Sequence, residues 1–126
     1  MLAPDRLGDV AVQISDEDFD KAVSEALDQV PGEFLDMLDN VVILVEDEPD
    51  GPDKNLLGLY SGFPLSARDS MYGGVLPDQI FIYRGPLKRY CASLEDLVEE
   101  IGVTVVHEIA HFFGIDDDQL DEMGWG

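Results

Sequence analysis

The stretch from Ser93 to Gly114, SLEDLVEEIGVTVVHEIAHFFG, decides the fold of this chain of 126 residues. Ser93 and Asp96 form the Ser-x-x-Asp pattern of a helix N-terminus, and Gly114 suits the left-handed turn that ends many helices. Between them, apolar residues recur at the spacing of one helical face: Leu94, Val98, Ile101, Val105, Ile109 and Phe112. The stretch therefore predicts a long helix near the C-terminus, running to about Phe113.

The two histidines of the chain, His107 and His111, lie four residues apart on this helix. Side chains four residues apart are surface neighbours, with Cβ atoms about 5–6 Å apart, so two imidazoles can converge on one metal ion. At about 100° per residue, both histidines fall on the side opposite the apolar stripe. Histidines of a packed core would lie within that stripe, so their position favours metal binding.

Glu108 follows the first histidine and lies about 100° round the helix from it. A carboxylate there can reach a metal-bound water rather than the metal, which is the place of a general base. A zinc site also needs a third protein ligand, with a fourth position left for water. Three aspartates, Asp116 to Asp118, follow the helix, and capping or first-turn charge accounts for Asp116 and Asp118.

The stretch from His107 to Asp117 reads H-E-x-x-H-x-x-G-x-x-D. It resembles the metzincin pattern of zinc metallopeptidases, in which the glycine turns the chain and a third ligand, usually histidine, returns to the metal. The matching residue here is Asp117, and some small bacterial zincins use aspartate at this place. The resemblance implies a Zn²⁺ site made by His107, His111 and Asp117. Asp121, one turn further on the same face, is the competing third ligand.

Further segments resemble a family of small bacterial single-domain zincin-like metallopeptidases: LLGLY from Leu56, LPDQI from Leu76 and IYRGPL from Ile82. The resemblance covers nearly the whole chain, from residue 15 to residue 125. It implies a minimal zincin, which is the N-terminal half of a protease fold without the second subdomain. It also implies a zinc-dependent metallopeptidase that hydrolyses peptide bonds with a metal-activated water and Glu108 as the base.

The remaining sequence predicts shorter elements around the long helix. Capping and breaking residues delimit three further helices, at residues 15–30, at residues 32–39 and from Asp116 onward. Runs of β-branched and aromatic residues predict strands at 41–45, 56–60 and 79–83. The Gly-Pro pair at 85–86 is expected to close the third strand.

This order of elements predicts an α+β domain with a small, mostly antiparallel sheet packed on helices and the active-site helix near the C-terminus. Residues 1–14 show no clear period and are expected to form a flexible arm. The zincin-like domain then spans residues 15–126. Cys91 is the one cysteine, so no internal disulfide can form. We expect it to be a small buried hydrophobe, because no histidine is left to activate it.

The charge of the chain limits its partners. It carries 28 acidic and 7 basic residues, a net charge of −21, which repels nucleic-acid phosphates and attracts cations and basic peptides. Its longest apolar runs are too short to span a membrane, and its N-terminus lacks the pattern of a signal peptide. We therefore expect a cytoplasmic protein that acts on a peptide or protein substrate, with neither nucleic acid nor membrane as partner. The sequence does not indicate an oligomeric state.

Two other functions stay open at this point. One is a zinc-binding but inactive zincin that serves as an interaction module. The other is an acidic regulator with a structural metal, in which Asp121 or Glu122 fills the fourth position of a closed site. For a peptidase, chemistry alone offers Tyr60, Tyr83 and Arg84 as donors to the oxyanion, although strand packing or surface charge accounts for each one.

Overall fold

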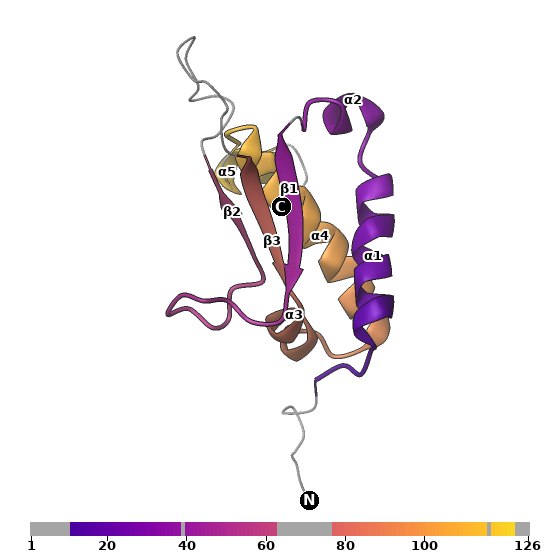
Figure 1. Cartoon of the computed structure of the whole chain (residues 1–126). Helices are drawn as coiled ribbons and strands as arrows, with labels where there is room; N and C mark the ends of the chain where they lie inside the picture. The colour runs from indigo at the N-terminus through magenta and orange to yellow at the C-terminus, as the bar shows by residue number, and fades with distance from the viewer. Residues whose placement is uncertain (1–10, 39, 63–76, 116, 123–126) are drawn as a thin grey trace, which may run out of the picture.

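The structure is a computed structural model that describes residues 11–38, 40–62, 77–115 and 117–122; for residues 117, 120 and 121 it describes the backbone only. Along the chain the elements are α1 (Asp16–Asp28), α2 (Gly32–Leu35), β1 (Val41–Glu46), β2 (Gly58–Ser61), β3 (Asp78–Tyr83), α3 (Arg84–Tyr90), α4 (Leu94–Phe112) and α5 (Asp117–Glu122). Their order and type confirm the predicted α+β class, with the motif helix α4 near the C-terminus (Figure 1).

The three strands form one sheet in the order β1-β3-β2. β2 runs antiparallel to β3, with Tyr60 opposite Ile80, whereas β1 runs parallel to β3, with Ile43 opposite the same Ile80. The sheet is therefore mixed, and in this detail it differs from the mostly antiparallel sheet that we predicted. A parallel pair needs a crossover between its strands, and a pattern of apolar residues does not reveal where such a connection travels.

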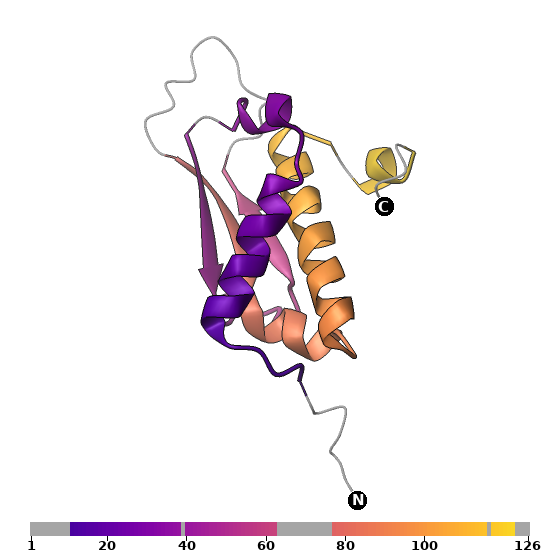
Figure 2. The same cartoon turned by 90° about the vertical axis from the view of Figure 1, so that its right-hand side faces the viewer.

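Two helices, α1 and α4, lie on the same face of the sheet (Figures 1 and 2). The core fills the space between them and the sheet. Its fully buried side chains come from α1, β3, α3 and α4: Phe19, Ile80, Ile82, Leu87, Leu97, Ile101, Val105 and Phe112. Because α4 contacts both α1 and the sheet, it is held along most of its length, which gives the motif on it a rigid support.

The buried surface of α4 is wider than the predicted apolar stripe. Ile101, Val105, Ile109 and Phe112 are buried as expected. The prediction was wrong for Leu94 and Val98, whose exposed fractions are 52% and 51%. A helix between two partners buries two adjoining sectors of its surface, so part of the polar side is covered by the sheet and part of the apolar stripe is left outside.

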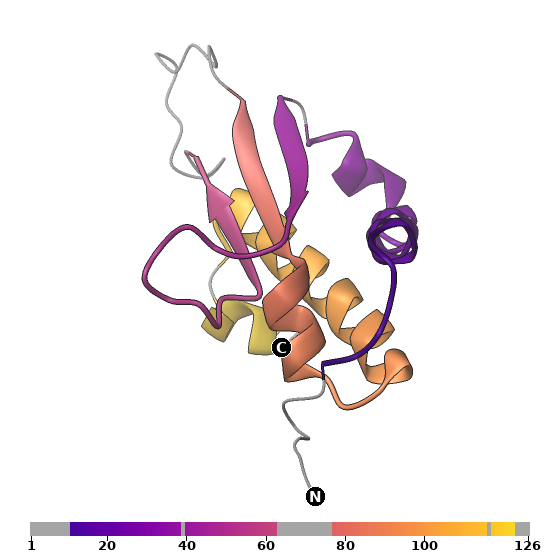
Figure 3. The same ribbon diagram turned by 60° about the horizontal axis from the view of Figure 1, so that its bottom comes forward.

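The helix α3 was not predicted, because Gly85 and Pro86 indicated the end of a strand. Tyr83 is its N-cap, so Pro86 lies in the first turn, where a helix has no use for a backbone N–H. Figure 3 shows α3 continuing from β3 at one end of the sheet. Gly85 lets the loop after β1 come close, because a Cβ there would lie 2.9 Å from the Asp47 carbonyl oxygen, which accepts the Gly85 N–H at 2.8 Å.

The segment that precedes α1 is held where the structure describes it. The N–H of Val12 donates to the carbonyl of Lys88 at 3.1 Å, and Val12 and Ile14 pack against the core. Two residues of the arm expected at residues 1–14, Val12 and Ile14, thus contact the domain; residues 1–10 lie outside the described residues. Within the described ranges, no helix is long and apolar enough to cross a membrane.

Candidate metal centre

The helix α4 has the two ends that its sequence predicts. The Ser93 side chain accepts a hydrogen bond from the N–H of Asp96 at 3.1 Å. At the other end Gly114 has a φ of 82°, its N–H donates to the His111 carbonyl, and the N–H of Ile115 donates to the Ala110 carbonyl. These two bonds form a Schellman motif, which ends the helix and turns the chain three residues after the second histidine.

His107 offers an unsatisfied nitrogen inside the protein. Its Nε2 atom is buried and has no hydrogen-bond partner among the residues that the structure describes. A buried polar atom without a partner is rare, because it loses its bonds to water and gains nothing in return. A metal ion is one partner that would satisfy this nitrogen, since imidazole is a common ligand of zinc.

Glu108 lies beside both histidines and under the sheet. Its side chain is buried, and its Oε1 lies 3.2 Å from Nδ1 of His111. The carboxylate also accepts the backbone N–H of Tyr60 from β2. Burial raises the pKa of Glu108 above its ordinary value, while the charge and hydrogen bond of His111 and the Tyr60 N–H act in the opposite direction. Glu108 is thus fixed in place by two separate elements.

The strand β2 can lie this close to α4 because residue 58 is a glycine. A Cβ at Gly58 would stand 2.7 Å from Cγ2 of Thr104 and 3.2 Å from Cγ of Glu108. Thr104 and Glu108 are one helical turn apart on α4 and are both buried under this strand. In the sequence, Gly58 stands out only as part of the segment LLGLY that resembles the family. A glycine within a strand is itself a sign of close backbone approach and points to this contact.

Replacing Gly58 by alanine should destabilise the protein and disturb the surroundings of Glu108. The added methyl group meets Thr104, and it also meets the backbone oxygen of Phe81 at 3.0 Å, which cannot move aside like a flexible side chain. We expect the free energy of unfolding to fall by about 1–3 kcal/mol, measured by urea denaturation. The matched control is Gly51→Ala, where a Cβ has no neighbour within 4 Å. An equal loss in both variants would show that the packing against α4 is not the cause.

Two of the three candidate oxyanion donors, Tyr60 and Arg84, donate to carboxylates outside the α4 motif, and the remaining one, Tyr83, is buried. The Tyr60 hydroxyl donates to Asp78 at 2.5 Å, and Tyr60 contributes to the site through its backbone. The ring of Tyr83 stacks on that of Phe81 with centroids 6.0 Å apart, on the face of β3 opposite the core side chains Ile80 and Ile82.

The third candidate, Arg84, lies in an ion-pair network between α1 and the loop after β1. Its guanidinium donates to both carboxylate oxygens of Asp20 at 2.9 Å and to Asp47 at 3.0 Å. These two carboxylates raise the pKa of Arg84, and burial opposes them as the largest single effect. Arg84 therefore ties the fold together at the α3 end of the sheet.

Cys91 is buried, as predicted. Burial raises the pKa of its thiol, with Glu100 and Asp96 adding to the effect, so the reactive thiolate is disfavoured. This agrees with a packing role and leaves the α4 motif as the chemistry-bearing group.

The third ligand falls where the structure describes little. The side chains of Asp117 and Asp121, and all of Asp116, lie outside the described residues. The backbone of Asp117 is described, and it begins α5, three residues beyond Gly114. Within the described part of the chain, no three His, Cys, Asp or Glu side chains gather as a metal site. Both the two histidines as ligands and the choice of Asp117 as the third ligand therefore stay predictions.

Comparison with known proteins agrees with this architecture. A solved structure of a conserved hypothetical protein from Thermo thermophilus is similar in fold, with a TM-score of 0.56 and 24% sequence identity over 87% of this chain and 97% of that one. No curated protein gives a significant match. The model of the zincin-like metallopeptidase family matches residues 38–125, which include all three strands and the α4 motif. The chain therefore belongs to the zincin-like metallopeptidase family.

Proposed function

We propose that this protein is a zinc-dependent peptidase in which His107, His111 and Asp117 hold the metal and Glu108 is the general base. The observation that carries the proposal is the buried Nε2 of His107, which has no partner within the described ranges, next in sequence to the buried carboxylate of Glu108. Both groups are costly to bury in a protein that makes no use of them. Family membership supports the same assignment at the level of the class.

The donor set suits zinc. Two imidazole nitrogens and one carboxylate oxygen are ligands that Zn²⁺ accepts, and three protein ligands leave a position for water. We choose Asp117 because the Schellman motif at Gly114 redirects the chain after His111. Asp117 then follows three residues beyond Gly114, at the start of α5. Zinc in such a site lowers the pKa of a bound water to about 7 and polarises a substrate carbonyl.

The protein's own contribution to the reaction lies in how Glu108 is held. One carboxylate oxygen is next to Nδ1 of His111, and the group accepts the N–H of Tyr60, so its direction is fixed before a substrate arrives. From this position Glu108 takes a proton from the attacking water and returns it to the leaving amine nitrogen. β2 and α4 together shield the carboxylate from bulk water. The carboxylate therefore exchanges its proton with the attacking water and the leaving amine rather than with solvent.

The proposal is tested by removing and restoring the metal. Protein purified without added metal should contain about one zinc ion per chain, and it should hydrolyse members of a mixed-sequence peptide library. A chelator should abolish cleavage, and added Zn²⁺ should restore it. Absence of zinc, with none taken up on titration, would overturn the proposal.

A second outcome distinguishes the alternative function. If the protein binds zinc and cleaves no peptide in the library, the inactive zincin that acts as an interaction module is the better account. If the coordination contains four protein ligands and no water, the metal is structural. X-ray absorption on the zinc-loaded protein separates these two coordination types.

A further inference from the structure

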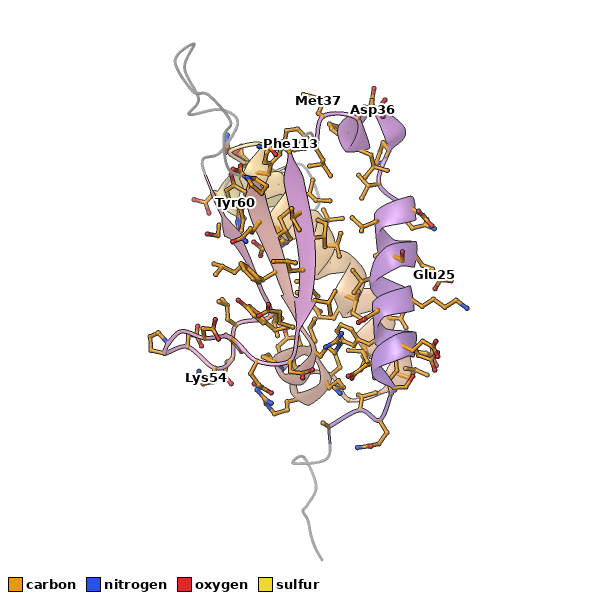
Figure 4. All side chains as sticks on the ribbon, in the orientation of Figure 1. Glu25, Asp36, Met37, Lys54, Tyr60 and Phe113 are labelled. Carbon is orange, nitrogen blue, oxygen red and sulfur yellow. The ribbon has the colours of Figure 1, made fainter. Side chains whose placement is uncertain are left out.

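A second feature of the protein is a groove between the helices α1 and α2 on one side and α4 on the other. It encloses about 600 Å³ and is lined almost wholly by apolar side chains, among them Val30, Phe34, Met37, Val106, Ile109 and Phe113. Figure 4 labels Met37 and Phe113 at the α2 end of the molecule. His107, Glu108 and His111 are not among its lining residues, so the groove is separate from the metal centre.

The described side chains around this groove leave it open. The exposed fraction of Met37 is 49%, and a shallower continuation toward the N-terminal half of α4 is lined by Val98, which is 51% exposed. On α4, Leu94, Val98, Gly102 and Val106 follow one another at intervals of four residues and so share one side of the helix. A stripe of this kind with little covering it is typical of a helix-binding surface.

Gly102 lies where the groove and its continuation meet. A glycine in the middle of a helix lowers the stability of the helix relative to alanine. A Cβ at this position would meet nothing within 4 Å, so the packing of the described residues does not demand a glycine. A partner whose backbone approaches α4 closely would demand one, because any side chain at residue 102 would stand between the two.

The rim of the groove indicates the charge of the partner. Glu25, Asp28 and Glu99 line the continuation and are exposed, and none of the described lining residues is basic. A second copy of a chain with a net charge of −21 would bring like charges together, and an anionic membrane would do the same. A basic partner would instead be attracted by the carboxylates of this rim.

We infer that this groove is a docking site for an amphipathic helix of another protein, with apolar side chains on one face and lysines or arginines on the other. The apolar face fills the hollow over Gly102, and the basic face meets the acidic rim. This inference does not depend on peptidase activity, because it uses no residue of the metal centre.

The test uses the full chain and a synthetic amphipathic helix with leucines on one face and lysines on the other. Binding is measured by calorimetry, beside a scrambled peptide of the same composition. Gly102→Phe should weaken binding of the amphipathic peptide by at least about tenfold. The matched control Gly51→Phe adds the same side chain at an exposed loop position with open space around it, and it should bind like the wild type.

Two further variants keep the result independent of folding. Gly102→Ala should raise the midpoint of thermal unfolding by roughly 2–5 °C while weakening binding, a pair of opposite effects that a folding defect cannot produce. Glu25→Gln should weaken binding at low salt, whereas Glu17→Gln on the same helix should not.

Three outcomes would overturn the inference. The first is equal affinity for the scrambled peptide, since it would show only attraction to an acidic surface. The second is unchanged affinity in Gly102→Phe. The third is a dimer of the protein alone that Gly102→Phe dissociates, because a second copy of the chain would then be the occupant.

Discussion

Replacing Glu108 by glutamine should lower peptide hydrolysis by a factor of about 10²–10⁴ and leave the zinc content unchanged. The carboxamide has the size of the carboxylate, and its oxygen can still accept the N–H of Tyr60, so the contact between α4 and β2 is kept. What is lost is the ability to take a proton from water. The fold should not suffer, because burial disfavours the charged form of Glu108 and glutamine carries no charge.

The measurement compares kcat on one cleaved peptide, with zinc content determined on the same samples. Glu100→Gln is the matched control, since it removes a carboxylate from the same helix two turns away, and it should retain wild-type activity. Activity within a few-fold of wild type in Glu108→Gln would reject Glu108 as the base. Activity lost equally in both variants would point to the charge of the helix rather than to one residue.

Replacing His107 by alanine should reduce zinc affinity by more than about 100-fold, the upper end of what the loss of a merely supporting residue causes. Among the described residues the buried Nε2 atom of His107 has no hydrogen-bond partner, so the substitution would remove a proposed ligand and an unsatisfied group at the same time. The zinc affinity should therefore fall sharply, while the midpoint of thermal unfolding of the metal-free protein changes little. Competition with a chromophoric chelator gives the affinity.

The same titration identifies the third ligand. Asp117→Ala should lose a large part of the zinc affinity, and Asp121→Ala should bind zinc nearly as well as the wild type. The opposite result would assign the ligand to Asp121 and remove the metzincin-like element from the proposal. Asp118→Ala, at an exposed position on the same helix, serves as the control for lost negative charge.

The helix that carries the candidate site was predictable because local signals determine it. Ser93, Gly114 and the spacing of His107 and His111 act within one element, and the structure has the caps that these residues indicate. The three strands were likewise found within two residues at each end. Caps and residue spacing of this kind depend only on residues that are close in sequence, so they can be recognised from the sequence alone.

What could not be predicted depends on which surfaces meet. Leu94 and Val98 have the spacing of core residues, yet they lie outside because α4 turns part of its polar side under β2. The burial of Glu108 follows from the same rotation and from Gly58, whose place in a strand indicates a close approach but does not say which helix approaches. The parallel pairing of β1 with β3 depends on how the chain crosses from one strand to the other, which the pattern of apolar residues does not reveal.

The bond between the Tyr60 N–H and Glu108 also bears on which backbone groups β2 offers to another strand. In the sheet that the described residues form, β2 is an edge strand, and an edge strand offers backbone groups on which a strand of another molecule can assemble into aggregates. Here the carboxylate of Glu108 already occupies the amide of Tyr60, and Gly58 faces the packed side of α4. A strand of another molecule would have to displace a buried carboxylate from its donor, so the residue that we propose as the base would also oppose edge-to-edge pairing at this position.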